Sequence, residues 1–516
     1  MNPALLPLFV GVPLIAAGLL AVLHRAPLWL RRTLYMAPSA AGLLASSCLI
    51  WLTREGSVLA HNVGLWKNGI SIPFVVDVFS ALMLWTTALL ILVCSAFASV
   101  VGDDERPFFS AVVMVLYAGV SGALMTGDVF NMFVFIEVML LPAYGLLAMV
   151  GTLGRIEAGR IYVTVNLLTS TVFLAGVALV YGVAGTVHIG ELAGAAKESP
   201  AVAVGMGVVL LALSIKASVV PVHGWLSRTY PFTSASVTAL FSGLHTKVAI
   251  YAIYRLYATV FDGDSTYLWI GVTAFSATML IGVLGAVGEN HTRSILVFHM
   301  ISQIGYILLG VALFTRVGLM AGIFYLIHHM IVKASLFLST GAVEHTHGTG
   351  ALDRLGGIGR RQPLIALVFM AAALSLSGLP PFSGFVAKLT LVIGAVEAGQ
   401  WAAAAIAIMV SLITLMSMLK IWGGVFWGTP PETEHLPDRG GTSEGPEGPE
   451  GPVGTVTRTE APPQERVRTA LIVPGLVLAL TTLCFGLGAQ VLLELSAQAA
   501  QGLMDTSPYV EAVLGR

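Results

Sequence analysis

The chain has few charged residues for its length. Of its 516 residues only 10% are Asp, Glu, Lys or Arg, while 56% are hydrophobic, and the mean hydropathy is +0.88. Soluble proteins carry roughly 25% charged residues. The shortage of charge therefore excludes a soluble domain and indicates a polytopic membrane protein. The net charge of −1 gives no support for nucleic-acid binding.

Cysteine is also scarce. Cys48, Cys94 and Cys484 lie far apart in apolar segments and have no metal-ligand spacing. Cysteines in such segments are mostly small hydrophobic residues. We therefore expect neither a metal site nor a cofactor.

The N-terminus lacks the positive charge that precedes the apolar run of a signal peptide. In MNPALLPLFVGVPLIAAGLLAVL the charge follows the apolar run instead, at His24, Arg25, Arg31 and Arg32. This order predicts a retained first helix with the N-terminus outside the cell.

Apolar runs of about 20 residues are long enough to cross a bilayer, and the sequence predicts about fourteen of them. The expected spans are 4–23, 34–53, 76–101, 108–126, 129–150, 161–184, 201–226, 233–259, 267–288, 294–314, 317–343, 363–397, 401–427 and 467–495.

Basic residues in the loops agree with this number of spans. With the N-terminus outside, fifteen arginines fall on the cytoplasmic side and four basic residues on the opposite side, as the positive-inside rule expects. The fifteen are Arg25, Arg31, Arg32, Arg106, Arg155, Arg160, Arg228, Arg293, Arg354, Arg360, Arg361, Arg439, Arg458, Arg466 and Arg468. The four are Arg54, Lys67, Lys197 and Arg316.

Two of the predicted spans contain helix-breaking residues beside a lysine. The seventh includes SIKASVVPVHGWLSRTYPF, with Pro221 and Gly224 after Lys216, and the twelfth includes LSLSGLPPFSGFVAKLTLV, with prolines and glycines before Lys388. Proline removes a backbone donor and glycine relaxes the chain, so both helices should break within the membrane. The two spans are five helices apart and run in opposite directions. This predicts two inverted five-helix repeats, helices 4–8 and 9–13.

We therefore expect an all-α polytopic membrane protein of about fourteen transmembrane helices, with helices 7 and 12 broken. Its parts are N-terminal helices 1–3 in 1–107, the first repeat in 108–259, the inverted repeat in 260–427, a cytoplasmic linker in 428–466, and a C-terminal helix and tail in 467–516. The linker is rich in Pro, Gly and Glu and cannot bury enough apolar surface to fold, so we expect it to be disordered.

Six ionisable residues stand out inside the predicted spans. They are Glu137, Lys216, Lys247, Lys333, Lys388 and Lys420. A charged residue at the centre of a transmembrane helix costs at least ~2.5–3.5 kcal/mol, and those that occur usually mark an ion or proton path. Lys420 lies near the end of its span and can reach the interface, so we place it outside such a path.

Glu137 and Lys216 are the pair that we expect to gate proton flow. Glu137 has no cation within one helical turn, so its counter-ion must come from another helix. A lysine removed from water releases its proton more readily, and a nearby carboxylate restores its hold. Movement of the carboxylate could thus switch the lysine. The alternative is a purely structural ion pair.

Lys247, His329, Lys333 and Lys388 are the remaining candidates for the path. His329 and Lys333 are four residues apart and share a helix face, and histidine titrates near neutrality, which suits a relay. Zinc is disfavoured, because the adjacent His328 and His329 lack ligand spacing and a Cys or carboxylate partner.

Other histidines allow two interpretations. His245 and His299 lie inside predicted spans and could either join the path or serve as hydrogen-bonded packing residues. The histidines of EHTHG at 344–348 are expected in a solvated loop at the membrane surface.

Four segments carry a resemblance to a known family. They are FIEVMLLPAYGLL, SIKASVVPVHGWLSRTYPFTSASVTALFSGLHTKVAIYAIYRL, HHMIVKASLFLSTGAV and SGLPPFSGFVAKL. They resemble the antiporter-like subunits shared by respiratory complex I, membrane-bound hydrogenases and Mrp-type cation/proton antiporters, and the resemblance covers nearly the whole chain. Many members have a second histidine one turn before His329, where this chain has Tyr325.

The resemblance implies a role for each candidate. Glu137 and Lys216 would form the gating pair, and Lys388 would be the terminal site. Between them, Lys247, His329 and Lys333 would relay protons.

The implied function is that of a proton-translocating membrane subunit of a multisubunit Na+/H+ antiporter in the bacterial plasma membrane. Its partners would be other membrane subunits, its ions protons and sodium, and it would need no cofactor. The alternative is a proton-pumping subunit of complex I or a membrane-bound hydrogenase. The sequence has no cluster ligands, haem motif or nucleotide loop, so we do not expect an enzyme. The buried charges disfavour a merely structural scaffold.

Overall fold

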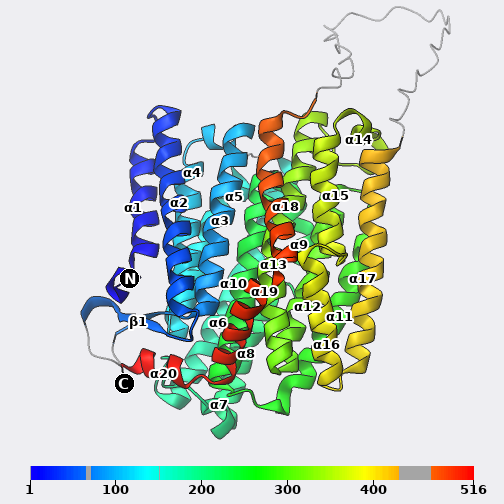
Figure 1. Cartoon of the computed structure of the whole chain (residues 1–516). Coiled ribbons are helices and arrows are strands. Elements are labelled where there is room, and N and C mark those ends of the chain that lie inside the picture. The colour runs from blue at the N-terminus through cyan, green and yellow to red at the C-terminus, as the bar shows by residue number, and fades with distance from the viewer. Residues whose placement is uncertain (1, 66–70, 150–151, 429–465, 516) are drawn as a thin grey trace, which may run out of the picture.

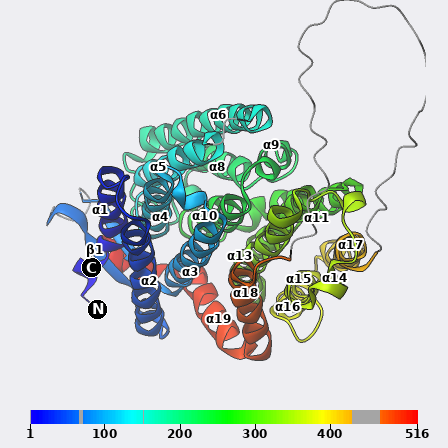
Figure 2. The ribbon, with the colours of Figure 1, turned by 90° about the horizontal axis from the view of Figure 1, so that it is seen from above.

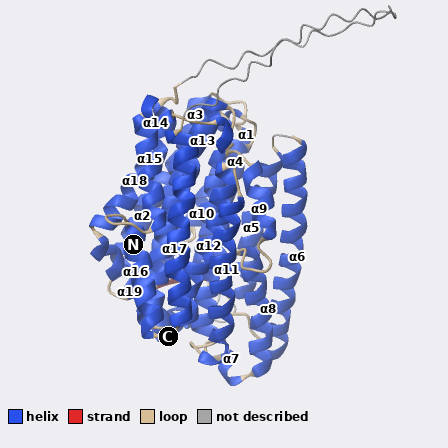
Figure 3. Ribbon diagram, turned by 90° about the vertical axis from the view of Figure 1, so that its right-hand side faces the viewer, coloured by secondary structure: helices blue, strands red, loops and turns tan. Residues whose placement is uncertain are grey.

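The computed structural model describes residues 2–65, 71–149, 152–428 and 466–515. In this part the chain forms a bundle of long helices that run roughly alongside one another (Figure 1), and helix dominates the ribbon (Figure 3). The predicted all-α polytopic class is confirmed. The linker predicted at 428–466 falls almost wholly on 429–465, which lie outside the described residues.

In the first half of the chain, two separate helices, α8 and α9, occupy the seventh predicted span. The helices of this half are α1 Leu8–Val22, α2 Leu28–Thr53, α3 Val78–Val101, α4 Phe109–Met125, α5 Val129–Ala148, α6 Leu153–Ala184, α7 Ala195–Glu198, α8 Pro200–Lys216, α9 Gly224–Thr229 and α10 Ala235–Val260. Two short strands, β1 Leu59–Asn62 and β2 Pro73–Val76, pair antiparallel in the loop after α2.

The second half of the chain also consists mainly of long helices, with an interruption after Ser377. Its helices are α11 Leu268–Gly288, α12 Thr292–Leu313, α13 Arg316–His347, α14 Ile358–Arg361, α15 Pro363–Ser377, α16 Ser383–Glu397, α17 Trp401–Ile421, α18 Thr469–Leu487, α19 Ala489–Met504 and α20 Ser507–Leu514. Single turns of 3-10 helix lie at Pro3–Leu5, Val63–Leu65, Asp103–Glu105, Tyr230–Phe232, Ser265–Tyr267 and Leu352–Arg354, and a π-helix at Trp422–Trp427.

Ten helical stretches in the described residues are long and apolar enough to cross a membrane. They are Pro3–Val22, α2, α3, α5, α6, Ser265–Gly288, α12, α13, Trp401–Trp427 and α18. Three shorter apolar helices, α4, α8 and α15, join them.

The centre of the bundle is formed by α10, α12 and α13. Every residue of α10 is buried, and so is all of the most apolar stretch of α13. Seen from above, α10 and α13 lie between α6 on one side and α18 and α19 on the other (Figure 2). Any polar side chain on these central helices must therefore find its partners within the protein.

The seventh and twelfth predicted spans each consist of two helices. The first helix of each pair ends at Lys216 or Ser377, and the second begins at Gly224 or Ser383. Gly378 follows α15 with φ +85°, a left-handed conformation that glycine adopts without a Cβ penalty. Both interruptions leave helix-end carbonyls inside the bundle.

Two predicted boundaries at the ends of helices are wrong. The last span, predicted as 467–495, ends at Leu487, and after Gly488 the helix α19 runs obliquely across the bundle (Figure 1). EHTHG is the last turn of α13 and not a surface loop, because Glu344 is tied to α12 by an ion pair with Arg293 and Gly348 caps the helix with φ +72°.

Two helix pairs, α4 with α5 and α11 with α12, pack through glycines with the same spacing. A Cβ on Gly119 or Gly122 of α4, or on Gly282 or Gly285 of α11, would collide with the facing helix. The contacts are Gly119 with Met139, Gly122 with Phe135, Gly282 with Ser302, and Gly285 with Phe298. In both pairs the residue that faces the first glycine lies 20 positions after it in the chain (119 to 139 and 282 to 302). The residue that faces the second glycine lies 13 positions after it (122 to 135 and 285 to 298). Glycine lets these backbones approach closely.

Arg255 is an ionisable residue inside a span that the sequence did not single out. Its side chain is 1% exposed, and its Nη2 donates to Asp77 Oδ2 at 2.6 Å. Asp77 also caps α3 through Ser80, and the ring of Tyr509 in α20 lies 4.4 Å from the guanidinium carbon. This cluster ties the end of α10 to the start of α3 and to the C-terminal helix.

We expect Asp77→Asn to destabilise the protein by about 3–5 kcal/mol, because it leaves a buried guanidinium without its counter-charge. Asparagine can still cap α3, so the loss of stability is due to the loss of the carboxylate charge. Thermal unfolding of the detergent-purified protein measures it. The double variant Asp77→Asn/Arg255→Met removes both charges and should unfold closer to wild type than Asp77→Asn alone. A fully additive loss in the double variant would contradict the buried pair.

Candidate functional site

Glu137 of α5 and Lys216 of α8 meet inside the bundle. Lys216 Nζ lies 4.0 Å from Glu137 Oε1, and the side chains are 5% and 27% exposed, respectively. Lys216 is the last residue of α8, where the interruption of the seventh predicted span begins. The two residues that the sequence pairs across 79 positions (137 to 216) are thus within ion-pair distance.

Helix α6 supplies the polar groups around this pair. Ser170 Oγ donates to Glu137 Oε1, and Lys216 Nζ donates to Asn166 Oδ1 at 3.5 Å. Both residues are buried. The sequence did not single them out, because a neutral Ser or Asn is common in membrane helices. Their four-residue spacing on one helix face was the available signal.

Lys247 and Lys333 lie on the central helices α10 and α13 and are fully buried. Lys247 Nζ donates to Thr246 Oγ1 at 3.0 Å, and Lys333 Nζ donates to the carbonyl of Leu296 at 2.7 Å. Within the described ranges neither has a carboxylate within 4.0 Å. In the described residues their polar partners are therefore uncharged groups, and Lys333 Nζ also lies 5.7 Å from the centre of the Phe337 ring.

His329 lies between these lysines. It is within electrostatic range of Lys247, Lys333 and His328. Both of its ring nitrogens are buried, and neither has a hydrogen-bond partner among the residues that the structure describes. Buried polar atoms are nearly always hydrogen-bonded, so water is the natural partner of this imidazole. His329 and Lys333 do share a helix face, but they are not bonded to one another.

The neighbouring histidines divide into two kinds. His328 Nδ1 lies 2.8 Å from Ser383 Oγ, and His245 Nδ1 lies 3.1 Å from the hydroxyl of Tyr162. His299 of α12 is within electrostatic range of Lys333 and Lys388, and neither of its ring nitrogens has a partner in the described part of the chain.

Lys388 lies six positions into α16, yet its ammonium group reaches back to the interruption. Its Nζ donates to the carbonyl of Ser377, the last residue of α15, at 3.2 Å and to Ser411 Oγ at 3.1 Å. The ring of Tyr306 lies 5.1 Å from the same atom. Lys388 therefore places its charge at the C-terminal end of the first helix of its interrupted pair, and Lys216 is itself the last residue of the first helix of the other pair.

Tyr325 and Lys420 each have structural partners of their own. Tyr325, which stands in place of the second family histidine, donates its hydroxyl to Gln303 and stacks on Tyr306. Lys420, in contrast, donates to the carbonyls of Val287 at 3.0 Å and Glu289 at 2.7 Å. It thus caps α11 near the end of the bundle and is not in contact with the other lysines.

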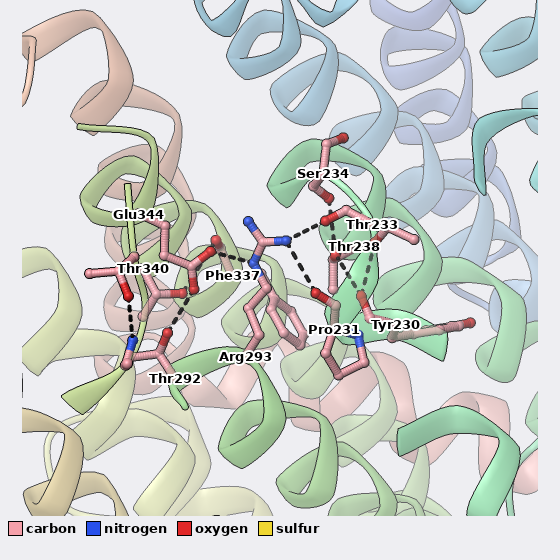
Figure 4. Close-up of polar contacts among 12 residues, drawn as sticks. Tyr230, Pro231, Thr233, Ser234, Thr238, Thr292, Arg293, Phe337, Thr340 and Glu344 are labelled. Carbon is pink, nitrogen blue, oxygen red and sulfur yellow. Dashed lines mark hydrogen bonds and ion pairs between the residues drawn. The ribbon is translucent and has the colours of Figure 1, made fainter. Parts of the chain in front are cut away.

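A second polar cluster fixes the turn that follows α9 (Figure 4). Arg293 Nε lies 2.5 Å from Glu344 Oε2, and Arg293 Nη1 donates to the carbonyls of Pro231 and Thr233. Thr292 Oγ1 donates to the other oxygen of Glu344 at 2.7 Å. The turn in the first half of the chain is thereby attached to α12 and α13 of the second half.

No group of three or more His, Cys, Asp or Glu side chains in the described ranges is arranged to hold a metal ion. The ionisable groups described above are lysine amines, histidine imidazoles and the carboxylate of Glu137, all of which can be protonated reversibly.

Comparison with known proteins identifies relatives over the full length. A family described as "NADH:quinone oxidoreductase/Mrp antiporter, TM" matches residues 126–414. The D subunit of the Na(+)/H(+) antiporter of Alkalihalophilus pseudofirmus is 34% identical over 99% of this chain and 98% of its own. A chain of the Mrp complex from Dietzia sp. DQ12-45-1b is 54% identical, with a TM-score of 0.93 and 99% of both chains covered.

A chain of respiratory complex I from Thermus thermophilus shares the fold. The TM-score is 0.77 at 24% identity, over 97% of this chain and 99% of the other.

Gly384→Ala should disturb the site at Lys388. An added Cβ would collide with the carbonyl of Ser375 and come within 3.1 Å of His328 Nε2, and such overpacking costs about 1–3 kcal/mol. We expect a lower unfolding temperature in detergent. The matched control is Gly207→Ala in α8, where a Cβ meets nothing within 4 Å; this variant should unfold at or above the wild-type temperature. Equal unfolding temperatures for the two variants would contradict the close packing at Gly384.

Proposed function

Because this chain belongs to the NADH:quinone oxidoreductase/Mrp antiporter family, we propose that it carries protons across the membrane as one subunit of a multisubunit Na+/H+ antiporter. Its motif SGLPPFSGFVAKL is typical of the D-type subunit, and the full-length relatives from Alkalihalophilus pseudofirmus and Bacillus subtilis are D subunits of Na+/H+ antiporters. The observation that carries the proposal is the line of buried cations that starts at the Glu137–Lys216 pair.

The pair works as a proton switch in this proposal. Two unit charges 4 Å apart interact by about 4 kcal/mol at an effective dielectric constant of 20. A carboxylate at this distance favours protonated Lys216, and a carboxylate that is neutralised or withdrawn lets the lysine release its proton. Ser170 and Asn166 hold the two groups in place.

Release from Lys216 passes inward along Lys247, His329 and Lys333 to Lys388. The central lysines have no carboxylate within ion-pair distance in the described part of the chain, so a proton on one raises the free energy of a proton on the next. His329 supports transfer between them because imidazole can accept at one nitrogen and donate at the other. Occupied sites thus push protons toward the terminal lysine.

We infer that the interrupted helices belong to two inverted repeats, 108–259 and 260–427. The shared glycine spacing of α4–α5 and α11–α12 supports this division, as do the matching interruptions after Lys216 and Ser377. Inverted repeats place their interruptions in opposite membrane halves. Lys216 and Lys388 then serve opposite faces, and the basic loops put the N-terminus outside.

The D-type character of the chain favours the antiporter over a redox-driven pump. The relatives with 34% and 54% identity are an Na+/H+ antiporter subunit and a chain of an Mrp complex, while the complex I chain shares only the fold. Other membrane subunits of the complex are the expected partners.

Glu137→Gln and Lys216→Ala should each reduce Na+/H+ exchange to background in the assembled complex, because each removes one charge of the switch. Membrane vesicles from a strain without its own antiporters report the exchange as a dye-monitored pH change on addition of sodium. Lys420→Ala, outside the path, is the control and should retain exchange. Wild-type exchange from either pair variant at normal expression would refute the switch.

The purified chain alone should not exchange ions in liposomes, whereas the complex purified with its partner subunits should, because the partners complete the ion path. Both samples are reconstituted at equal subunit content, and the pH change on a sodium jump is recorded. Robust Na+/H+ exchange by the chain alone would overturn the subunit role and make it a self-sufficient antiporter.

A further inference from the structure

We propose that a buried polar stripe on α6, formed by Tyr162, Asn166 and Ser170, together with His245 and Tyr230, is an access route that carries protons between the Glu137–Lys216 pair and the end of the bundle where α6 begins. The inference rests on the proposed function and deepens it by naming the residues that bring protons to that pair.

The stripe runs along one face of α6 at four-residue spacing. Ala158, Tyr162, Asn166 and Ser170 are 2%, 0%, 3% and 7% exposed, and residues four apart on a helix lie on the same face. The opposite face carries apolar residues such as Leu168, which is 64% exposed. Twelve residues at 1.5 Å each give a length of about 18 Å from Ala158 to Ser170.

The inner end of the stripe touches both members of the pair. Ser170 donates to Glu137, and Asn166 accepts from Lys216. Asn166 also donates to the carbonyl of Tyr162 at 2.8 Å. Hydrogen bonds through the Asn166 amide thus connect the main-chain carbonyl of Tyr162 to the Lys216 ammonium group, and the Tyr162 hydroxyl makes a separate contact.

Tyr162 connects the stripe to a titratable group on the central helix α10. Its hydroxyl lies 3.1 Å from His245 Nδ1, and His245 is within electrostatic range of Lys216. His245 Nε2 is buried and has no partner in the described part of the chain. A hydroxyl and an imidazole can each accept and donate a proton, so this contact suits transfer better than a carbonyl contact would.

The outer end of the stripe opens on a hollow of about 330 Å³. Ala158 and Ile161 of α6 line it on one side, and Arg228, Pro231 and Phe232 line it on the other. Ala158, which lines the hollow, lies one helical turn before Tyr162 on the face of the stripe. Pro231, on the other wall, follows Tyr230 in the chain.

Tyr230 is held beside Pro231 by the cluster of Figure 4. Its turn is fixed by the bonds from Arg293 to the carbonyls of Pro231 and Thr233, and its ring extends away from Arg293. The hydroxyl of Tyr230 is buried without a partner among the described residues, as is that of Tyr144, whose ring lies 5.7 Å from the Tyr162 ring. Water satisfies such groups in most proteins. Water at these hydroxyls would connect the hollow to Tyr162.

The transfer step balances without any other reactant. In the starting state the ring proton of His245 is on Nε2 and Nδ1 is free to accept. Tyr162 gives its hydroxyl proton to Nδ1 while its oxygen takes a proton from a hydronium ion on the side of the hollow, which becomes water. His245, now protonated on both nitrogens, gives its Nε2 proton to a water on the side of Lys216. Rotation of the ring, or exchange of its proton through water, then restores the Nε2–H tautomer. One proton enters and one leaves, and the same steps run in reverse.

Tyr162→Phe tests the route, because phenylalanine keeps the ring among Tyr144, Trp225 and Phe241 and removes only the hydroxyl. In vesicles that hold the assembled complex we expect exchange about ten-fold slower or more, with a changed solvent deuterium isotope effect. Tyr254→Phe is the control. Tyr254 is equally buried in α10, and its hydroxyl donates to the carbonyl of Ile307, away from the stripe; its exchange rate and isotope effect should match wild type.

A Tyr162→Phe rate within two-fold of wild type, with an unchanged isotope effect, would overturn the route and leave the proposed function intact. Absence of exchange from the wild-type complex would instead refute the proposed function itself.

Thiol labelling tests the same route without a measurement of transport. It still gives an answer if the Tyr162→Phe variant fails to assemble. In a background with Cys48, Cys94 and Cys484 replaced by alanine, Ala158→Cys should react with a membrane-impermeant thiol reagent from one face. Val177→Cys, also buried on α6 but beyond the pair, should not react. Failure of Ala158→Cys to react from either face would overturn the route.

Discussion

The architecture of this protein follows from the cost of keeping several ammonium groups away from water. Within the described residues only Lys216 among the four path lysines has a carboxylate at ion-pair distance. The others rely on hydroxyls and main-chain carbonyls, such as Ser377 for Lys388. A regular helix has no free carbonyl to offer except at its end. At Lys388 the interruption of the helix supplies this carbonyl. Lys247 instead binds a hydroxyl, and Lys333 binds a main-chain carbonyl inside the continuous helix α12, whose oxygen can accept a second hydrogen bond. The buried glycines allow the helices around them to pack closely.

The buried cations are of two kinds: those with a carboxylate partner and those without one. Arg255 has a close partner in Asp77 and an aromatic ring on another side, so its charge is fixed and contributes to the fold. Lys247 and Lys333 have neither a carboxylate partner nor access to solvent, so their charged and neutral forms are closer in free energy. Reversible protonation requires the second kind, whereas the first kind fixes the helices that it connects.

Much of this arrangement could be predicted from the sequence, because a charge in an apolar segment is conspicuous. Glu137, Lys216, Lys247, Lys333 and Lys388 were named on that basis, and proline and glycine indicated where α8 and α15 end. Arg255 was missed because its partner, Asp77, lies at the edge of a span 178 positions away. Tyr162, Asn166 and Ser170 are neutral and leave no trace in a search for charge. EHTHG was assigned to a loop because only the folded chain brings Arg293 to Glu344.

The deep burial of α13 also bears on how the membrane receives the chain during synthesis. This helix carries Lys333 and, near its middle, the adjacent His328 and His329. Its later neighbours α18 and α19 follow it by more than a hundred residues. When α13 leaves the ribosome it faces lipid or the insertion machinery. Its lysine then opposes insertion by ~2.5–3.5 kcal/mol, and each Leu, Ile, Phe or Val at the helix centre returns about 0.3–0.6 kcal/mol. The cost of the lysine thus offsets much of the free energy that the apolar residues gain on insertion. Stable insertion of α13 therefore depends on packing against α10 and α12, which are synthesised earlier.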